Sequence, residues 1–292
     1  MNDHSDRLPV VDSHVHVFSP RVFQERDSLV ERDRWFGELY ANPKASLARA
    51  EDLIASMDRS GIDVSVLCGF PWSDHQLCVD HNDYMAVSAG EYPSRVKWLA
   101  TVLPGDPAAP EEAEQCFRGG ASGIGELNAD GQGFDLSEPE VLAPIVEVCE
   151  EWDRPIMFHC SEPVGHMYPG KGTATPDRLL QFLERFPNVR VIAAHWGGGL
   201  PFYELMPEVE RLTRNVLYDS AASTYLYQFP VFRNVIELVG ARRVMFASDY
   251  PVLGQERLLK RVKRLQLARD TSNLILSENA HREFQINWRN NT

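Results

Sequence analysis

Short apolar segments recur along the whole chain, and amphipathic segments separate them. Most of the short segments are continuously apolar rather than alternating, which is typical of strands buried on both faces of a parallel sheet. Eight segments have this character: residues 8–12, 63–68, 96–103, 122–127, 155–159, 189–195, 216–219 and 243–248. The pattern therefore predicts eight buried strands.

The segments between these strands carry helix signals. Thr175, Pro176 and Asp177 supply an N-cap, a proline at the first helical position and an acidic first turn. Apolar residues then recur at helical spacing until Pro187 ends the pattern. Further helices are predicted at residues 48–60, 141–152, 231–239, 256–267 and 273–284.

Eight strand–helix units in 292 residues average about 36 residues each, which suits a (β/α)8 TIM barrel with insertions. The fold class predicted is therefore α/β, with one domain spanning residues 1–292; an open doubly wound sheet is the alternative. Two connections are unusually long: residues 17–47 after the first strand and 161–174 after the fifth. Both are expected at the C-terminal face of the barrel, where active sites form.

Residues that bind metals or transfer protons lie where predicted strands end. The first such pair is two residues apart, so both side chains point to the same side of an extended segment. The complete set is His14, His16, Glu126, His159, His195 and Asp249. A barrel would gather all six around its mouth. Because a four-coordinate ion needs fewer ligands, either two ions are bound or some of these residues perform acid–base chemistry.

Composition narrows the classes of partner. Lysine and arginine total 29 against 42 acidic residues, a net charge of −13, which disfavours nucleic-acid binding. The longest apolar runs are far shorter than the roughly 20 residues of a membrane span, and residues 1–6 do not resemble a secretion signal. Five cysteines without a Cys-x-x-Cys motif favour a reduced, cytoplasmic protein. A small-molecule substrate is therefore expected.

Several of these strand ends resemble motifs of one enzyme family. The segments are residues 12–16, His159, 194–198, 219–220 and 248–251. Together they resemble the amidohydrolase superfamily, and most closely its amidohydrolase-2 branch, across essentially the whole chain. That branch includes hydrolases and non-oxidative decarboxylases similar to aminocarboxymuconate-semialdehyde decarboxylase. The resemblance also implies that homo-oligomers are common.

The resemblance assigns roles to the strand-end residues. It implies that His14 and His16 are the first metal-ligand pair and that His159 is a further ligand. Asp249 would bind the metal and act on the nucleophilic water. His195 would bind a second metal or polarise the substrate. The expected cofactor is one or two divalent ions, with zinc first and manganese or iron as alternatives.

Glu126 departs from the pattern of the decarboxylases. Binuclear TatD-like members of the superfamily use a glutamate on the fourth strand as a bridging carboxylate, and Glu126 resembles that residue. The alternative is that Glu126 is a hydrogen-bond partner of a ligand histidine.

These features predict a metal-dependent hydrolase that attacks a C–N or C–O bond of an amide, ester or lactone with a metal-activated water. Asp249 would take the proton of that water, and the metal or His195 would polarise the carbonyl. The alternative is a metal-dependent decarboxylase or hydratase of a small carboxylic acid. A catalytically silent barrel and a TatD-like nuclease are further alternatives.

Substrate contacts are expected from loops beside the metal ligands. Trp72 follows the second strand and would form an apolar wall, unless it only packs the barrel. Residues 161–172 would act as a lid carrying His166, Tyr168 and Lys171, with Lys171 holding an anionic group of the substrate. The alternative for this loop is a rigid surface segment with a solvated lysine.

Asp219 ends the seventh strand and would orient a ligand, contact substrate or cap the next segment. Cys160 is expected to pack in the core rather than to react. The remaining histidines lack a strand-end position and are expected to be ordinary: His4, His75, His81 and His281.

Overall fold

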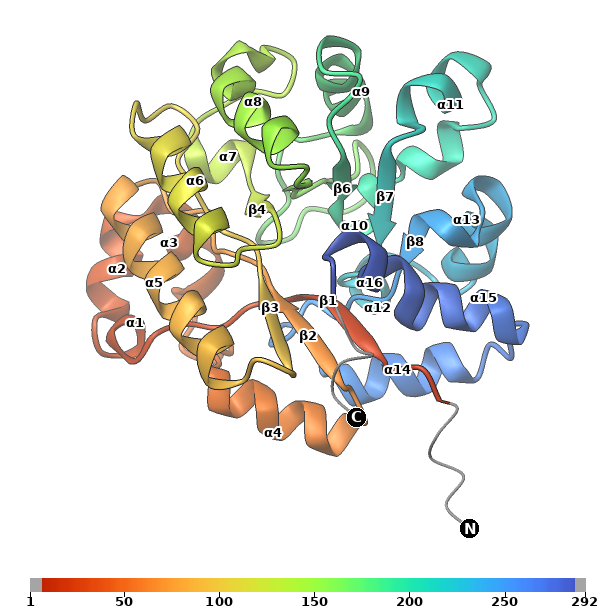
Figure 1. Ribbon diagram of the computed structural model, residues 1–292, viewed down its shortest axis with the longest axis horizontal. Coiled ribbons are helices and arrows are strands. Elements are labelled where there is room, and N and C mark those ends of the chain that lie inside the picture. The colour runs from red at the N-terminus through yellow and green to blue at the C-terminus, as the bar shows by residue number, and fades with distance from the viewer. Residues whose placement is uncertain (1–6, 287–292) are drawn as a thin grey trace.

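Eight short parallel strands form the centre of the molecule, with helices packed around them (Figure 1). The computed structural model describes residues 7–286, so His4 and the remainder of residues 1–6 and 287–292 lie outside the described residues. The strands are β1 Val11–Val15, β2 Val64–Leu67, β3 Val96–Trp98, β4 Ile124–Leu127, β5 Ile156–Phe158, β6 Val191–Ala193, β7 Val216–Asp219 and β8 Val244–Met245. Each overlaps one of the eight predicted segments. β1 begins three residues later than predicted, which places His14 inside the strand.

The strands close into a barrel. They are hydrogen-bonded in the orders β1-β2-β3 and β4-β5-β6-β7-β8. Bridges between Ala100 and Ile124 and between Val15 and Tyr250 join these two sets on both sides. The predicted (β/α)8 barrel is therefore confirmed, and the open doubly wound sheet is excluded.

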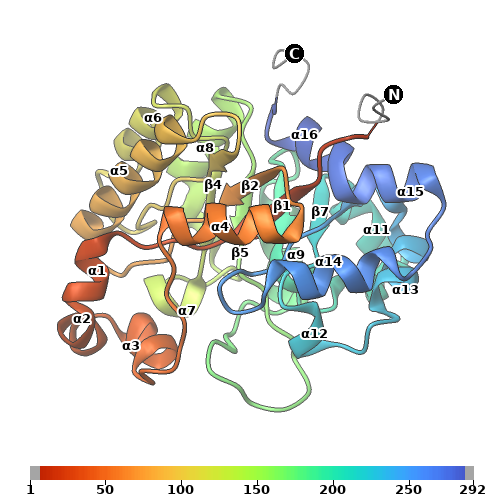
Figure 2. The same ribbon diagram turned by 90° about the horizontal axis from the view of Figure 1, so that it is seen from below.

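Alternate strand residues serve two separate cores. Along β6, Ile192 belongs to a cluster inside the barrel, whereas Val191 and Ala193 face the surrounding helices. Helix α16, Asn279–Glu283, contributes Ala280 to the inner cluster. In Figure 2, α16 lies at the opposite end of the barrel from α12, Ser223–Leu226, and from the loop after β5. The other end is thus available for a site.

Five surrounding helices lie near their predicted positions, at residues 50–60, 143–151, 176–185, 231–239 and 255–263. The helices at residues 75–91, 109–118 and 207–213 were not predicted individually. The longer helices are α4 Ala50–Ser60, α5 His75–Glu91, α6 Ala109–Arg118, α8 Ala143–Glu151, α9 Pro176–Arg185, α11 Pro207–Thr213, α13 Val231–Val239 and α14 Gln255–Lys263. The short ones are α7 Ala129–Gln132, α10 Ala194–Gly197 and the 3-10 turns Pro139–Leu142, Leu200–Tyr203 and Ala241–Arg243. The helix predicted over residues 273–284 is instead three pieces: α15 Arg269–Asn273, a π-helical turn Leu274–Glu278, and α16.

The first long connection folds as three helices, α1 Pro20–Gln24, α2 Arg26–Arg32 and α3 Arg34–Tyr40. Their buried side chains form an aromatic cluster with the segment after β2. Its rings are Phe18, Trp35, Phe36, Tyr40, Phe70 and Trp72. The second long connection, residues 161–174, contains no helix or strand. Glu38 of α3 joins the two connections, because its Oε1 accepts a hydrogen bond from the Gly170 amide at 3.1 Å.

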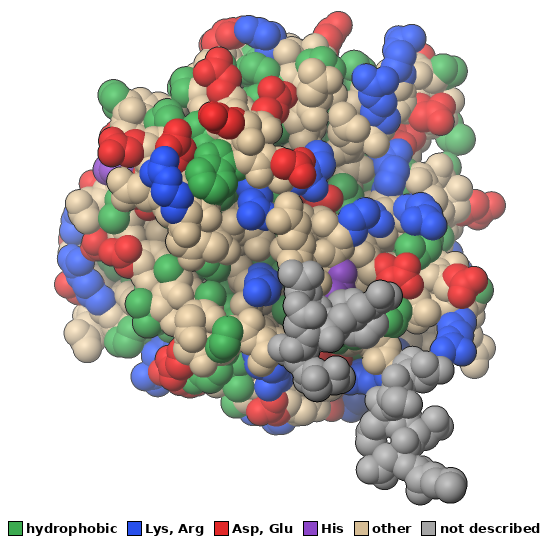
Figure 3. Space-filling model, viewed as in Figure 1, with side chains coloured by type: hydrophobic (Ala, Val, Ile, Leu, Met, Phe, Trp, Pro, Cys, Tyr) green, Lys and Arg blue, Asp and Glu red, His purple; other side chains and the backbone are tan. Residues whose placement is uncertain are grey.

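In the described part of the chain, the helices, the cysteines and the surface charges do not mark a second site. Within residues 7–286, no helix combines the length and apolarity needed to cross a membrane. All five cysteines are buried and unpaired. On the face drawn in Figure 3, acidic and basic side chains are interspersed rather than gathered by sign.

His81 makes the stability of the fold depend on pH. Its Nε2 accepts a hydrogen bond from the Phe70 amide at 3.2 Å, and its ring packs against Phe18 and Trp72. Burial, together with the charge of His16, lowers the pKa of His81 from 6.5 to about 3. The folded protein therefore holds His81 neutral at pH values where the unfolded chain binds a proton.

As the pH falls from about 6 to about 4, we expect protonation of His81 in the unfolded chain to lower the free energy of unfolding by about 1.4 kcal/mol per pH unit. His81→Gln should reduce this slope by that amount, because glutamine cannot bind the proton. Urea unfolding at several pH values measures it, with His166→Gln, at an exposed histidine, as control. Parallel slopes for His81→Gln and the native protein would contradict the assignment.

Candidate metal centre and pocket

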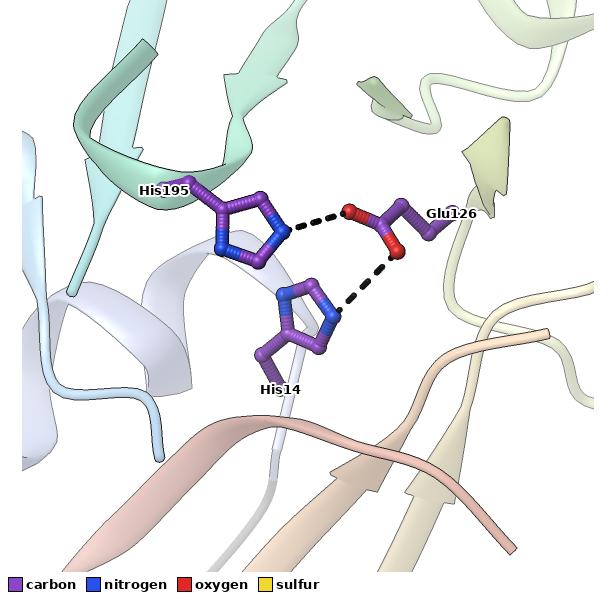
Figure 4. Close-up of side chains that lie close together, drawn as sticks. All are labelled: His14, Glu126 and His195. Carbon is purple, nitrogen blue, oxygen red and sulfur yellow. Dashed lines mark hydrogen bonds and ion pairs between the residues drawn. The ribbon is translucent and has the colours of Figure 1, made fainter. Parts of the chain in front are cut away.

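Six side chains from five strand ends meet at one end of the barrel. His14 lies in β1 and Glu126 in β4, and the other four follow strands: His16 follows β1, His159 β5, His195 β6 and Asp249 β8. Five of the six are buried, and His159 is partly buried. In Figure 4, the Glu126 carboxylate lies between His14 and His195, with one oxygen directed to each ring. The structure thus brings together all six predicted ligands.

Hydrogen bonds orient the two β1 histidines. Nδ1 of His14 lies 2.7 Å from Oδ2 of Asp219, and Nδ1 of His16 lies 3.1 Å from the carbonyl oxygen of Cys68. Both Nδ1 atoms therefore donate protons to oxygen acceptors. This arrangement directs the Nε2 atoms into the centre, as expected for metal-binding histidines.

The ligand atoms are at, or a few tenths of an ångström beyond, the separations that a single divalent ion needs. The two Nε2 atoms of His14 and His16 are 3.0 Å apart. Oε2 of Glu126 lies 3.6 and 3.7 Å from them, and Oδ1 of Asp249 lies 3.6 Å from His16 Nε2. Atoms bound to one ion at about 2.1 Å are separated by about 3.0–3.4 Å. His14, His16 and Asp249 form one compact ligand group, and His14, Glu126 and His195 form another.

The charges of the centre also favour a cation. Burial alone lowers the pKa of His14, but Glu126 and Asp219 outweigh it and raise that pKa well above its usual value. Burial and the charge of His14 lower the pKa of His16. A proton on His14 Nε2 therefore occupies the short gap to His16. Metal binding replaces such protons, because ligand histidines must be neutral.

Glu126 contacts both halves of the centre. Its Oε2 faces the β1 histidines, whereas its Oε1 lies 3.0 Å from His159 Nδ1 and 3.2 Å from His195 Nε2. Burial raises the pKa of Glu126, but His14 and His159 outweigh it and hold the pKa well below its ordinary range. The other nitrogen of His159 is 3.0 Å from the carbonyl oxygen of Gly170. Glu126 therefore connects the metal-ligand group to His159 and His195.

His195 occupies an unusual backbone conformation. Its φ of 56° lies in the left-handed region, which is unfavourable for a residue with a Cβ, and such residues cluster at functional sites. Oδ1 of Asp219 accepts a hydrogen bond from the His195 amide at 2.8 Å. Gly198 follows at φ 61°, where a Cβ would come within 2.3 Å of the Ser161 carbonyl oxygen. Asp219 thus holds both His14 and the backbone of His195.

A pocket of about 690 Å³, open solvent included, leads to this centre. Its inner end is formed by His16, Glu126, His159, His195 and Asp249. Its walls are largely aromatic and aliphatic, and include Trp35, Leu39, Tyr40, Phe70, Tyr168 and Tyr225. Trp35 contacts the His159 ring edge-on, with ring centroids 6.0 Å apart. The pocket is therefore suited to a small, flat, apolar body with a polar group at the inner end.

The predicted substrate contacts are distributed unevenly. Tyr168 lines the pocket, and Asp219 is fully buried behind His14 rather than exposed to it. Trp72 does not line the pocket, because it is enclosed in the aromatic cluster of the first connection. His166 and Lys171 do not line it either. Nζ of Lys171 donates hydrogen bonds to backbone carbonyl oxygens of its own loop.

Trp35, Tyr40 and Tyr225 were not expected in the pocket. Trp35 and Tyr40 belong to α3, within the long connection that the sequence places at the C-terminal face. The aromatic content of that connection was the available signal. Tyr225 lies in α12, which carries no comparable motif.

The barrel and its histidine–carboxylate centre define a protein of the (β/α)8 class with a candidate metal centre. A family model described as amidohydrolase matches residues 11–286, and the chain belongs to that family. One curated relative is 2-amino-3-carboxymuconate-6-semialdehyde decarboxylase of Dictyostelium discoideum. It is 23% identical over 236 residues, which cover 68% of this chain and 65% of the relative. The match thus spans slightly less than two thirds of that relative's length.

Solved structures share the fold. One is 5-carboxyvanillate decarboxylase from Novosphingobium aromaticivorans with manganese and 4-hydroxy-3-methoxy-5-nitrobenzoic acid, at a TM-score of 0.79 and 22% identity. The match covers 96% of this chain and 97% of that one. Another is 2,6-dihydroxybenzoate decarboxylase from Rhizobium, at a TM-score of 0.73 and 19% identity, covering 96% and 99%.

These comparisons contradict the prediction of a hydrolase. The curated relative and both structures are named as decarboxylases, which agrees with the alternative derived from the sequence. The ligand residues were a poor guide to the reaction, because the same set activates water or holds a carboxylate. Zinc is not confirmed as the ion, since the carboxyvanillate structure contains manganese.

We expect Asp219→Asn to weaken metal binding by about 10- to 100-fold, because the His14 ring loses its charged hydrogen-bond acceptor. Competition with a chromophoric chelator measures the affinity, and circular dichroism checks the fold. Unchanged metal affinity with a raised KM would instead assign Asp219 to substrate binding.

Proposed function

We propose that this protein is a metal-dependent, non-oxidative decarboxylase of an aromatic carboxylic acid. The observation that carries the proposal is the pocket itself, in which aromatic walls lead to buried histidines and carboxylates. Family membership and the decarboxylases among the similar proteins support the same reaction. Manganese is the first ion to test, because it is present in the carboxyvanillate decarboxylase structure.

In this proposal His14, His16 and Asp249 hold the ion together with Oε2 of Glu126. Their ligand atoms are 3.0–3.7 Å apart along the contacts between them. A divalent ion bound there would hold the substrate's carboxylate or an adjacent hydroxyl and offset its negative charge. The aromatic walls would keep the ring flat against the imidazoles.

His195 is the proposed proton donor. Its Nε2 faces Oε1 of Glu126 at 3.2 Å, so the proton resides on Nε2, directed toward the inner end of the pocket. Its Nδ1 is buried and has no hydrogen-bond partner within the described residues. The backbone bond to Asp219 fixes the position of the ring. A positioned imidazole of this kind is a general acid.

The reaction then needs one proton and no oxidant. Burial lowers the pKa of His195, but Glu126 outweighs burial and raises this pKa to about 9, so the ring is an imidazolium. It gives its Nε2 proton to the ring carbon that carries the carboxylate and becomes a neutral imidazole. The bond between that carbon and the carboxylate breaks, its electron pair returns to the ring, and carbon dioxide leaves. His195 regains a proton from water. Glu126 accepts a hydrogen bond from His195 at the start of the cycle and so keeps the donor aligned.

Chelation should abolish activity. We expect treatment with a strong chelator to reduce carbon dioxide release from 2,6-dihydroxybenzoate by at least about 100-fold, because the buried ligands then bind protons instead of a cation. Added manganese should restore the rate. Carbon dioxide is measured directly, and isotope-labelled water tests for incorporation of oxygen. Turnover that survives removal of the metal would refute the metal dependence.

His195→Gln should separate the proton donor from the metal ligands. We expect the variant to keep about one ion per chain and to lose roughly 100- to 10,000-fold in turnover, since general acid catalysis contributes that much. Glu126→Gln should also lower turnover and should weaken metal binding. Elemental analysis counts the ions. A native count of two that falls to one in His195→Gln would make His195 a ligand and contradict its role as the acid.

A further inference from the structure

The basic side chains that line the pocket are the histidines of its metal end, His16, His159 and His195. Among the described residues that line it, none is lysine or arginine. Its ionisable groups lie mainly at the inner end, where Glu126 and Asp249 are beside the histidines. The walls consist of Trp35, Leu39, Tyr225 and similar uncharged side chains. Charge recognition is therefore confined to the metal end.

Lys171 and Arg34, each next in sequence to a residue that lines the pocket, are engaged elsewhere. Nζ of Lys171 lies 2.6 Å from the carbonyl oxygen of Val164 and 3.2 Å from that of His166, and it is 5.6 Å from the centre of the Tyr168 ring. The Arg34 guanidinium donates to the carbonyl oxygen of Asp130 at 3.3 Å. Lys171 thus bonds to the backbone of its own loop and Arg34 to the backbone of α7, and neither side chain lines the pocket.

Carboxylates lie directly behind two parts of the wall. The Tyr168 hydroxyl donates to Oε2 of Glu162 at 2.7 Å, and the Gly170 amide donates to Oε1 of Glu38 at 3.1 Å. Both Tyr168 and Gly170 line the pocket. Negative charge behind an apolar wall opposes the entry of an anion there, in addition to the cost of removing that anion from water.

We infer that the substrate carries a single negative group, which binds at the metal end, and that the rest of its aromatic ring is uncharged. This inference deepens the proposed function and rests on it for the identity of the acid. It distinguishes between the kinds of substrate that the names of the similar proteins contain. By its name 2,6-dihydroxybenzoate has one carboxylate, whereas 5-carboxyvanillate has two. The wall of this pocket suits the first kind.

Three ligands built on the same salicylate ring test the inference on the manganese-loaded protein. They are salicylate, 5-carboxysalicylate, which adds a second carboxylate, and 5-carbamoylsalicylate, which adds a neutral group of equal size. Calorimetry measures binding, and carbon dioxide release is measured separately. We expect 5-carboxysalicylate to bind at least ~10-fold more weakly than 5-carbamoylsalicylate, because only charge differs between them.

Val252 offers a matched pair of variants. It lines the pocket and is 55% exposed, so a longer side chain is accommodated. Val252→Arg should improve binding of 5-carboxysalicylate relative to 5-carbamoylsalicylate by about fivefold over Val252→Gln, since the new cation pairs with the second carboxylate. Lys171→Met should leave the native ratio unchanged, because Lys171 faces its own loop.

The outcomes separate this inference from the proposed function. Equal binding of 5-carboxysalicylate and 5-carbamoylsalicylate, or no binding of any of the three, overturns the inference. An unchanged ratio in Val252→Arg, or a changed one in Lys171→Met, also overturns it. Charge-selective binding without carbon dioxide release from any monocarboxylate refutes the decarboxylase and leaves the selectivity intact.

Discussion

The junction between β1 and β8 is the constraint on which the centre depends. The Asp249 amide donates to the His14 carbonyl oxygen at 3.0 Å, so barrel closure itself sets the separation of two ligands. Buried Asp12 reinforces this junction by accepting hydrogen bonds from the amide and hydroxyl of Ser248 at 2.8 and 2.6 Å. Burial raises the pKa of Asp12 to about 6 despite these bonds. Ligand geometry is thus a consequence of strand pairing rather than of loop conformation.

The two long connections build the pocket upon this junction. Glu38 of the first connection accepts a hydrogen bond from Gly170 of the second, and the Gly170 carbonyl oxygen in turn contacts His159. Hydrogen bonds through Gly170 therefore connect the aromatic wall to the inner end of the pocket. A change in either connection would reach His159 through the backbone of one residue, Gly170.

Sequence reasoning performed best where backbone periodicity determines position. Strand ends placed His14, Glu126 and Asp249 in one centre, because the carboxyl ends of all barrel strands lie at one face. Prediction from the sequence was least successful where a side chain can form hydrogen bonds with several alternative partners. Lys171 binds loop carbonyls, a choice that only three-dimensional contacts determine. Helix α5 was not assigned individually, because its buried face includes polar residues such as Asn82.

The identity of the metal-binding residues does not by itself determine which reaction the centre catalyses. Hydrolysis and decarboxylation both need a cation beside a proton-transfer group. They differ in the proton transfer, because hydrolysis removes a proton from water and decarboxylation adds a proton to a ring carbon. In this centre the carboxylates of Asp249 and Glu126 both lie beside Nε2 of His16, whereas Nε2 of His195 lies beside Oε1 of Glu126 and Nδ1 of His159. In the proposed decarboxylation His195 is therefore the group that protonates carbon, and the uncharged aromatic walls contact the substrate ring that contains this carbon.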